Sequence, residues 1–320
     1  MVFISNTFGL KATTNNIVCV TKLNSVQKEP WLILGACSNV VLPEEVPFNC
    51  VSILKKNITV LSENKDHVLI RVDGGHNWND LVEICLFNKW HGLENLILIP
   101  GTVGAAPVQN IGAYGTEISD RIEKVHTIDL YTLKKYEFTN TECEFAYRDS
   151  VFKKKLVNHI IIAVDLKLDK TFRAITSHIN LTEHEQKNHI EISEIIRKTR
   201  LRKLPDPKLY GNAGSFFKNP IVKKNVCIEG LTKYPTTDPK FVKLSAAELI
   251  ENSGLKGKSI GGASVSSQHS LIIINNGFAT YKDIVELSQE VQDAVYQKYN
   301  IELEPEVKII PQDNLQPALV

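Results

Sequence analysis

The chain has 320 residues, 43% of them hydrophobic and 23% charged, an ordinary globular composition for a chain long enough to form two or three domains. Lys and Arg number 37 and Asp and Glu 36, so no overall charge favours nucleic acid or an anionic membrane as a partner. The six cysteines form no C-x-x-C pair, and no basic leader or run of roughly 18 apolar residues occurs, so we expect a cytoplasmic protein with reduced thiols, no metal site and no membrane insertion.

Short apolar runs near the start of the chain are typical of buried β-strands. They occur at Ile17–Val20, Trp31–Leu34 and Val68–Val72. A helix is predicted at about Trp78–Asn88, where apolar side chains recur at helical spacing and form a partial apolar face. This region therefore combines strands with a helix.

The next segment, Ile99–Gly115, has the most unusual composition in the chain. It holds four glycines and two prolines in 17 residues, with almost no charge. Glycine and proline disrupt both helices and strands, so the segment is not expected to form either. It is also too apolar for a solvated linker. We therefore predict a buried loop whose backbone lies against a ligand.

Strands are predicted again in the middle of the chain, at Ile122–Leu130, Lys135–Phe138 and His159–Leu168. A charged helix follows at about Ser193–Arg202. It ends before Pro205 and Pro207, which indicate a domain boundary because the residue before a proline is disfavoured in a helix.

The last third of the chain is predicted to contain two helices and a strand. Leu244–Asn252 is expected to form a helix that ends before Gly254, and Leu271–Ile274 a buried strand. The final helix begins at Thr280-x-x-Asp283, a pattern close to a capping box. Its apolar residues at helical spacing are Ile284, Leu287, Val291 and Val295. The whole chain is therefore of the α+β class, in three parts.

A glycine-containing segment, Gly35-Ala36-Cys37-Ser38-Asn39, follows the predicted strand at Trp31–Leu34. Glycine at a strand end lets backbone N–H groups approach a phosphate, and Ser and Asn add neutral donors. These residue types also favour ordinary turns, so the pattern is weak by itself. It lacks the G-x-G-x-x-G spacing of a dinucleotide fold, which argues against a Rossmann domain.

The combination of this segment with residues 92–115 is far more specific. Gly92-Leu93-Glu94-Asn95-Leu96, Ile99-Pro100-Gly101-Thr102-Val103-Gly104 and Pro107-Val108-Gln109-Asn110-Ile111-Gly112-Ala113-Tyr114-Gly115 resemble the signature of the UDP-N-acetylmuramate dehydrogenase (UDP-N-acetylenolpyruvoylglucosamine reductase) family, in its longer-form branch. The resemblance implies an FAD-binding fold of vanillyl-alcohol-oxidase type, made of two α+β subdomains and followed by a C-terminal α+β substrate-binding domain. It implies non-covalent FAD held by Gly35, Ser38, Asn39, Pro100, Gly101, Gly104, Gln109, Asn110, Ile111 and Gly112.

The resemblance also suggests how the chain divides and where it departs from its relatives. The first FAD-binding subdomain is expected at residues 1–66 with 307–320, the second at 67–204, and the substrate-binding domain at 205–306. Relatives usually carry a second glycine where this chain has Cys37, and the stretch between Cys19 and Trp31 looks shortened. A Cβ at residue 37 is expected to crowd a phosphate or to strain the backbone.

Three further blocks match the family and carry its chemistry. They are Ala146-Tyr147-Arg148-Asp149-Ser150-x-Phe152-Lys153, Gly211-Asn212-Ala213-Gly214-Ser215-Phe216-Phe217-Lys218-Asn219-Pro220 and Leu303-Glu304-Pro305-Glu306-Val307. By resemblance the catalytic arginine is Arg148, the serine proton donor Ser215 and the catalytic glutamate Glu306. Hydride addition to an enol ether places charge on the neighbouring carboxylate, which an arginine stabilises and a protonated glutamate can support. A serine then supplies the proton that the intermediate takes up at C2.

The basic run from Arg197 to Lys203 resembles a nucleic-acid patch, but a solvated helix face is the better interpretation in a chain of near-neutral charge. By resemblance, the residues that contact the substrate are Tyr114, Tyr147, His178, Lys203, Asn219 and His269. His178 stands where the longer-form branch carries a tyrosine in a loop over the nucleotide-sugar. The alternative is that His178 is an ordinary loop residue.

The resemblance implies an enzyme of peptidoglycan precursor synthesis. NADPH would reduce the bound FAD, and UDP-N-acetylglucosamine enolpyruvate would then be reduced to UDP-N-acetylmuramate by what we expect to be a monomer. One alternative is another FAD-linked oxidoreductase of the same fold, which would need a base in place of Ser215. The other is a flavin-binding protein that has lost catalysis, against which Arg148, Ser215 and Glu306 all argue.

Overall fold

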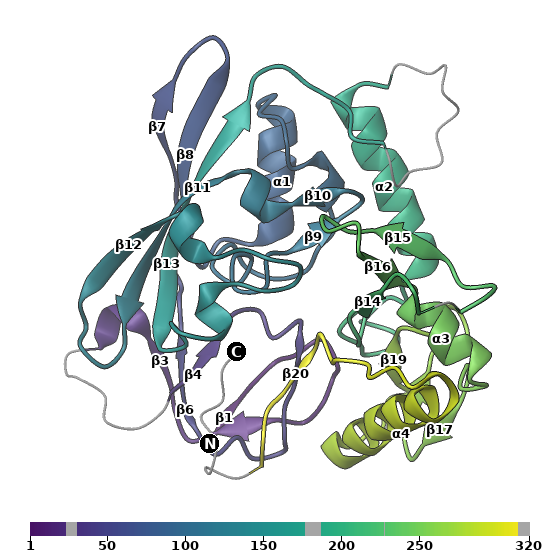
Figure 1. Ribbon diagram of the computed structural model, residues 1–320. Coiled ribbons are helices and arrows are strands. Elements are labelled where there is room, and N and C mark those ends of the chain that lie inside the picture. The colour runs from purple at the N-terminus through teal and green to yellow at the C-terminus, as the bar shows by residue number, and fades with distance from the viewer. Residues whose placement is uncertain (24–30, 177–186, 227, 313–320) are drawn as a thin grey trace.

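The computed structural model describes residues 1–23, 31–176, 187–226 and 228–312. Its strands and helices form three units, with the larger sheet on one side and the C-terminal helices on the other (Figure 1). Among the described residues, none of the helices combines the length and the apolar composition needed to cross a membrane.

The first unit is built around a small parallel sheet in the order β3-β6-β4. Its strands are β3 (Ile17–Cys19), β6 (Asn49–Ser52) and β4 (Trp31–Leu34). A short antiparallel pair, β1 (Val2–Phe3) with β2 (Thr13–Thr14), lies at the N-terminus. β5 (Val40–Val41) pairs in parallel with β20 (Lys308–Ile309), so the chain returns to this unit after residue 306.

The second unit contains a five-stranded antiparallel sheet in the order β12-β11-β13-β8-β7. Its strands are β12 (Lys135–Thr139), β11 (Ile122–Asp129), β13 (His159–Asp169), β8 (His67–Asp73) and β7 (Ile58–Glu63). Successive side chains of a strand point to opposite faces, and in β8 Val68, Ile70 and Val72 are the fully buried ones. One face of the sheet therefore carries the core.

Two helices and the 99–115 loop cover that face. α1 (Trp78–Phe87) begins where the Asn77 side chain accepts a hydrogen bond from the backbone of Asp80. α2 (His189–Lys203) begins with a capping box between Asn188 and Glu191. The loop ends in the short strand β9 (Gly112–Ala113), which pairs with β10 (Thr116–Glu117) directly after it. Such side chains satisfy one or two of the four backbone N–H groups that the start of a helix leaves unpaired.

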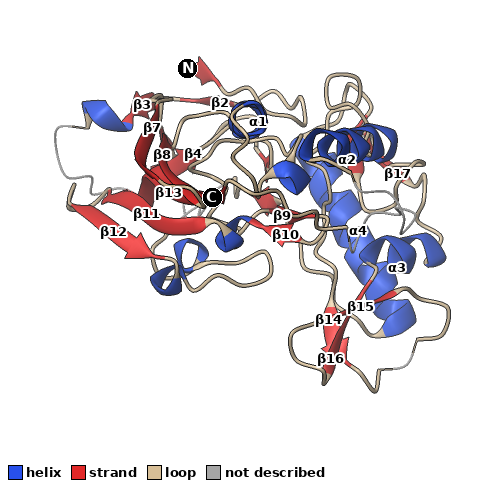
Figure 2. Ribbon diagram, turned by 90° about the horizontal axis from the view of Figure 1, so that it is seen from above, coloured by secondary structure: helices blue, strands red, loops and turns tan. Residues whose placement is uncertain are grey.

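The third unit contains two three-stranded sheets and two helices. The sheets are β14 (Ile221–Lys223), β16 (Phe241–Leu244) and β15 (Lys233–Pro235), and β17 (Ser259–Ile260), β18 (Ala263–Val265) and β19 (Ile273–Asn275). α3 (Ala246–Asn252) and α4 (Tyr281–Tyr299) pack beside them. Figure 2 shows the β14–β16 sheet extending away from the rest of the molecule.

Most predicted elements are confirmed, with shifted ends. The strand at Trp31–Leu34 and the capping box at Thr280 are as predicted. The helix predicted from Ser193 begins at His189, because the Asn188–Glu191 capping box lies upstream. The helix predicted from Leu244 begins at Ala246, because Leu244 completes β16. The strand predicted at Leu271–Ile274 begins two residues later, at Ile273, and ends at Asn275.

Candidate active site

A cavity of about 1000 Å³ is lined by residues of all three units. This is at the upper end of the roughly 300–1,000 Å³ typical of small-molecule sites, so it can hold a large ligand. Its wall comes from the segments 33–40, 98–112, 204–215 and 304–308, with Arg148 and Lys153 beside them. Segments far apart in the chain therefore share one wall.

The turn after β4 contributes the first part of the wall. A Cβ built on Gly35 would lie 3.2 Å from both the Ala105 Cβ and the Thr102 Oγ1, a tight contact that glycine avoids. Asn39 ties the turn to two other segments. Its Nδ2 donates to Gln109 Oε1 at 2.9 Å and to the Glu306 carbonyl at 3.1 Å. The turn, the 99–115 loop and the C-terminal segment are thus held together by one side chain.

Cys37, where relatives usually have glycine, has the strained backbone that the sequence predicted. Its φ is 50°, in the left-handed region that glycine adopts freely and other residues adopt at a cost of about 1–2 kcal/mol. The side chain is buried, and burial raises the pKa of the thiol to about 12. Cys37 therefore lines the cavity as a neutral thiol.

The 99–115 loop contributes the second part of the wall and depends on two glycines. Gly101 has a φ of 131°, which favours glycine strongly. A Cβ on Gly104 would lie 2.7 Å from the Ile161 carbonyl, so glycine allows the loop to touch strand β13. The Gly104 N–H also donates to the Gly74 carbonyl at 2.8 Å. The loop is thereby pressed against the sheet with its backbone facing the cavity.

These two parts of the wall fit FAD. Glycine backbone and the neutral donors of Ser38 and Asn39 suit a diphosphate, and the cavity has room for a fused-ring cofactor. Nine of the ten predicted cofactor residues line it: Gly35, Ser38, Asn39, Pro100, Gly101, Gly104, Gln109, Ile111 and Gly112. The tenth, Asn110, lies behind the wall and is fully buried. Its Nδ2 donates to Glu117 at 2.7 Å and to the Ala146 carbonyl at 3.2 Å.

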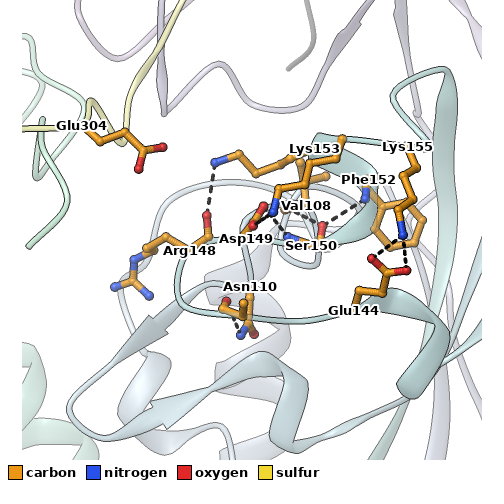
Figure 3. Close-up of polar contacts among 12 residues, drawn as sticks. Val108, Asn110, Glu144, Arg148, Asp149, Ser150, Phe152, Lys153, Lys155 and Glu304 are labelled. Carbon is orange, nitrogen blue, oxygen red and sulfur yellow. Dashed lines mark hydrogen bonds and ion pairs between the residues drawn. The ribbon is translucent and has the colours of Figure 1, made fainter. Parts of the chain in front are cut away.

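Arg148 lies at a tight turn in which Ala146 and Asp149 exchange two backbone hydrogen bonds of 3.1 Å. Its φ is 54°, at a turn position where glycine or asparagine is usual. The guanidinium Nη2 donates to the Gly112 carbonyl at 2.6 Å, and Nε lies 2.9 Å from Glu306 Oε1. Figure 3 shows the guanidinium pointing away from the turn. Strained backbone of this kind is concentrated at functional sites.

Glu306 faces Arg148 from the C-terminal segment. Its N–H donates to the Phe216 carbonyl at 2.8 Å, which places it next to Ser215 in the neighbouring segment. Burial raises the pKa of the Glu306 carboxyl, although the positive charges of Arg148, Lys153 and Lys218 oppose the rise. The carboxyl therefore keeps its proton to a higher pH than an exposed glutamate does.

Ser215 completes the predicted catalytic set on the cavity wall. It follows Gly214, whose φ is 71°, and a Cβ built on that glycine would have no other atom within 4 Å. It precedes the fully buried Phe216. The Asn212 side chain accepts a hydrogen bond from the Gly214 N–H at 2.9 Å and fixes the turn. Arg148, Ser215 and Glu306 thus reach the same cavity from three separate segments.

The cavity wall does not include the described residues that were predicted to contact substrate, which are Tyr114, Tyr147, Lys203, Asn219 and His269. Two of them, Tyr147 and Tyr114, interact with residues that do line it. The Tyr147 ring lies 5.3 Å from the Arg148 guanidinium carbon and 4.4 Å from Lys243 Nζ, and its phenol accepts from the backbone of Asn219. Tyr114 interacts electrostatically with Arg200. Burial and the charge of Lys203 both lower the pKa of His269. His178 lies outside the described residues.

Several cations on the wall were given no role from the sequence, among them Lys153 and Arg200. Lys153 closes the block that begins at Ala146, and its Nζ donates to the Arg148 carbonyl at 3.2 Å (Figure 3). Arg200 was assigned to a solvated helix face, yet it lies four residues after the buried Ile196 and shares its side of α2. Helical spacing could have revealed this. Among the described residues the Arg200 Nε has no hydrogen-bond partner, and burial lowers the pKa of the guanidinium.

Comparison with protein families gives two matches along the chain. The model described as UDP-N-acetylenolpyruvoylglucosamine reductase, C-terminal domain, matches residues 206–310, and that of an FAD binding domain matches residues 11–130. Together they cover the first two segments of the cavity wall and the segments that carry Ser215 and Glu306.

Whole-chain relatives agree with these matches. The UDP-N-acetylenolpyruvoylglucosamine reductase of Salmonella typhi is 40% identical over 325 residues, covering 96% of this chain and 94% of its own. That of Buchnera aphidicola is 42% identical over 324 residues, covering 95% and 96%. The crystal structure of UDP-N-acetylenolpyruvylglucosamine reductase from Thermus caldophilus superposes with a TM-score of 0.69 at 25% identity, covering 96% of each chain.

Proposed function

Because the chain belongs to the UDP-N-acetylenolpyruvoylglucosamine reductase family, we propose that Arg148, Glu306 and Ser215 are the side chains that reduce the enolpyruvyl substrate in the shared cavity. The observation that carries this assignment is the Arg148–Glu306 pair at 2.9 Å on the wall that also carries Ser215.

The predicted fold and activity are confirmed by the family. The protein is an FAD-dependent oxidoreductase with the FAD-binding fold of vanillyl-alcohol-oxidase type, and it reduces UDP-N-acetylglucosamine enolpyruvate in peptidoglycan precursor synthesis. Bound FAD would take a hydride from NADPH and supply it to C3 of the enolpyruvyl group. The residues proposed to hold it are the nine wall residues given above, with Asn110 supporting the loop from behind.

Arg148 stabilises the charge that forms on the substrate carboxylate. Its guanidinium is planar and always charged, and it is fixed by the Gly112 carbonyl and Glu306. A donor that is already oriented needs no rearrangement when negative charge develops, which is why such groups lower a barrier. Burial raises the pKa of Glu306, and in its protonated form the carboxyl donates a hydrogen bond to the same carboxylate.

Ser215 then donates a proton to C2. A serine hydroxyl is a weak acid, but the reduced substrate carries excess negative charge and is correspondingly basic. The open space beside Gly214 leaves the hydroxyl accessible from the cavity. The hydroxyl is restored by a proton from water.

The remaining assignments rest on the same family. We propose that Tyr114, Tyr147, His178, Lys203, Asn219 and His269 contact the UDP-sugar, and that the domains are residues 1–66 with 307–320, 67–204 and 205–306. NADPH is the proposed reductant. The protein is proposed to act in the cytoplasm, and the five free cysteines among the described residues support this location. It is also proposed to be a monomer.

The test is to separate the two half-reactions in a Ser215→Ala variant by stopped-flow absorbance. Reduction of the flavin by NADPH should be nearly unchanged, because Ser215 acts only on the second substrate. Reoxidation by the enolpyruvyl substrate should slow by roughly 10²–10⁴-fold, the loss expected for a positioned acid. Ser259→Ala, at an exposed position, should leave both steps unchanged. Equal slowing of both steps in Ser215→Ala would contradict the assignment.

A further inference from the structure

Lys153 occupies an unusual place for a lysine. It ends the short 3₁₀ turn Val151–Lys153, and its side chain bends back to the cavity instead of extending into solvent. Figure 3 shows its ammonium group directed at the carbonyl of Arg148, the contact of 3.2 Å described above. The next two lysines behave differently. Lys154 and Lys155 are exposed and pair with Asp149 and Glu144.

The turn that carries Lys153 is fixed to the cofactor loop. The Ser150 hydroxyl donates to the Val108 carbonyl at 2.6 Å and accepts from the Phe152 N–H at 3.3 Å. The Phe152 ring is buried and lies edge-on to Phe138, 5.8 Å between centroids. Lys153 is therefore attached to a rigid part of the wall.

The Arg148 peptide is the group that Lys153 restrains. With a φ of 54°, this residue does not hold the left-handed conformation by itself, because a side chain at that position is strained. A charged donor on its carbonyl fixes the orientation of the peptide, and charge-assisted hydrogen bonds are about twice as strong as neutral ones. The direction of the guanidinium follows from the direction of this peptide.

The same ammonium group also acts on Glu306. The charged groups that face Glu306 are Arg148, Lys153 and Lys218, with the Tyr147 phenol nearby. Those that face Lys153 are Lys218, Asp149, Glu304 and Glu306. Burial and Lys218 lower the pKa of Lys153, and the three carboxylates oppose this. Lys153 in turn favours the ionised form of Glu306.

We propose that Lys153 is a positioning residue for the reductive step, which holds the Arg148 peptide in its left-handed turn and places a positive charge beside Glu306. This rests on the function proposed for Arg148 and Glu306. If activity requires protonated Glu306, it is lost as pH rises through the pKa of that carboxyl. Removing the charge of Lys153 raises that pKa, so the alkaline limb of the pH profile must move to higher pH.

The experiment compares Lys153→Met, Lys153→Arg and the surface control Lys155→Met as FAD-loaded enzymes, with the two half-reactions measured across pH. In Lys153→Met we expect flavin reduction by NADPH to be unchanged, reoxidation to slow by about 10- to 100-fold, and the alkaline limb to shift upward. Lys153→Arg should restore the limb to its wild-type position and recover part of the rate. Lys155→Met should match the wild type in both.

If Lys153→Met keeps the wild-type rate of reoxidation and the wild-type position of the alkaline limb, the proposal is overturned. It is also overturned if both half-reactions slow equally and the alkaline limb does not move. If Lys153→Met does not retain FAD, Lys153→Gln replaces it, because glutamine keeps a neutral donor without the charge. The limb should then shift with a smaller loss of rate, and an unmoved limb again overturns the proposal. Wild-type enzyme that the substrate fails to reoxidise would instead contradict the proposed function itself.

Discussion

At the scale of single residues, Glu306 is balanced between burial, which favours its neutral form, and three cations, which favour its charge. If it works protonated, Glu306→Gln should retain more reoxidation activity than Glu306→Asp, because glutamine keeps the length and a neutral donor. Aspartate is shorter by one methylene, so its carboxyl lies farther from the substrate, and we expect the rate of reoxidation to fall by roughly 10²–10⁴-fold. Single-turnover reoxidation measures both, with the exposed Glu302→Gln as control. The reverse order would show that an acidic group at this position is indispensable.

Cys37 gives a second prediction at this scale, from the effect of burial on its thiol. A pKa raised from 9.0 to about 12 lowers the thiolate fraction about 1000-fold at pH 8, and the thiolate is the reactive form. Cys19 is only partly buried, and hydrogen bonds with Thr21 lower its pKa overall. Iodoacetamide should therefore modify Cys19 in the folded protein and leave Cys37 intact, as read by peptide mass spectrometry. Similar labelling of both would show that the turn opens in solution.

At the scale of elements, α2 places a cation on its buried side. Among the described residues Arg200 has no carboxylate partner, and its Nη2 donates a long hydrogen bond of 3.4 Å to the Leu98 carbonyl. Removing such a charge destabilises a fold less than breaking an ion pair does, whereas an anionic ligand loses its partner. We therefore expect Arg200→Met to weaken FAD binding about tenfold or more without lowering the thermal midpoint of the apoprotein. Reconstitution of apoprotein followed by flavin fluorescence gives the dissociation constant.

The control for this prediction lies on the same helix. Arg202→Met removes the same charge from an exposed position and should leave the affinity for FAD unchanged. Equal weakening by the two variants would assign the effect to net charge. A lower thermal midpoint in Arg200→Met alone would indicate that Arg200 supports the fold and not the ligand.

The elements also show what could be predicted from the sequence. Strands with a dense apolar pattern, such as Trp31–Leu34, were identified with their ends. Strand β7 and the strands β14 and β15 were not, because they are largely exposed. Strand β16, which buries Val242 and Leu244, was also missed, and its last residue was assigned to a helix. Leu244 was assigned to a helix because local apolarity cannot distinguish a strand partner of Lys233 from a first helical turn. Pairing between distant segments decides such positions.

At the scale of the whole molecule, the side chains proposed to be catalytic come from segments that no local pattern joins. Resemblance to the family identified Arg148, Ser215 and Glu306, and the structure brings all three to one cavity wall. It assigned no role in the cavity to Lys153 or Arg200. Their importance depends on burial and on neighbours distant in sequence, such as Glu306 and Tyr114, which a linear motif does not record.

The most direct test of the central claim is an anaerobic titration of the wild-type protein, followed by flavin absorbance. NADPH should bleach the bound FAD, and the enolpyruvyl ether of UDP-N-acetylglucosamine should then restore the oxidised spectrum stoichiometrically. The product should be UDP-N-acetylmuramate with a solvent-derived hydrogen at C2. A flavin that stays reduced after the substrate is added, or a purified protein that binds no flavin, would contradict the account.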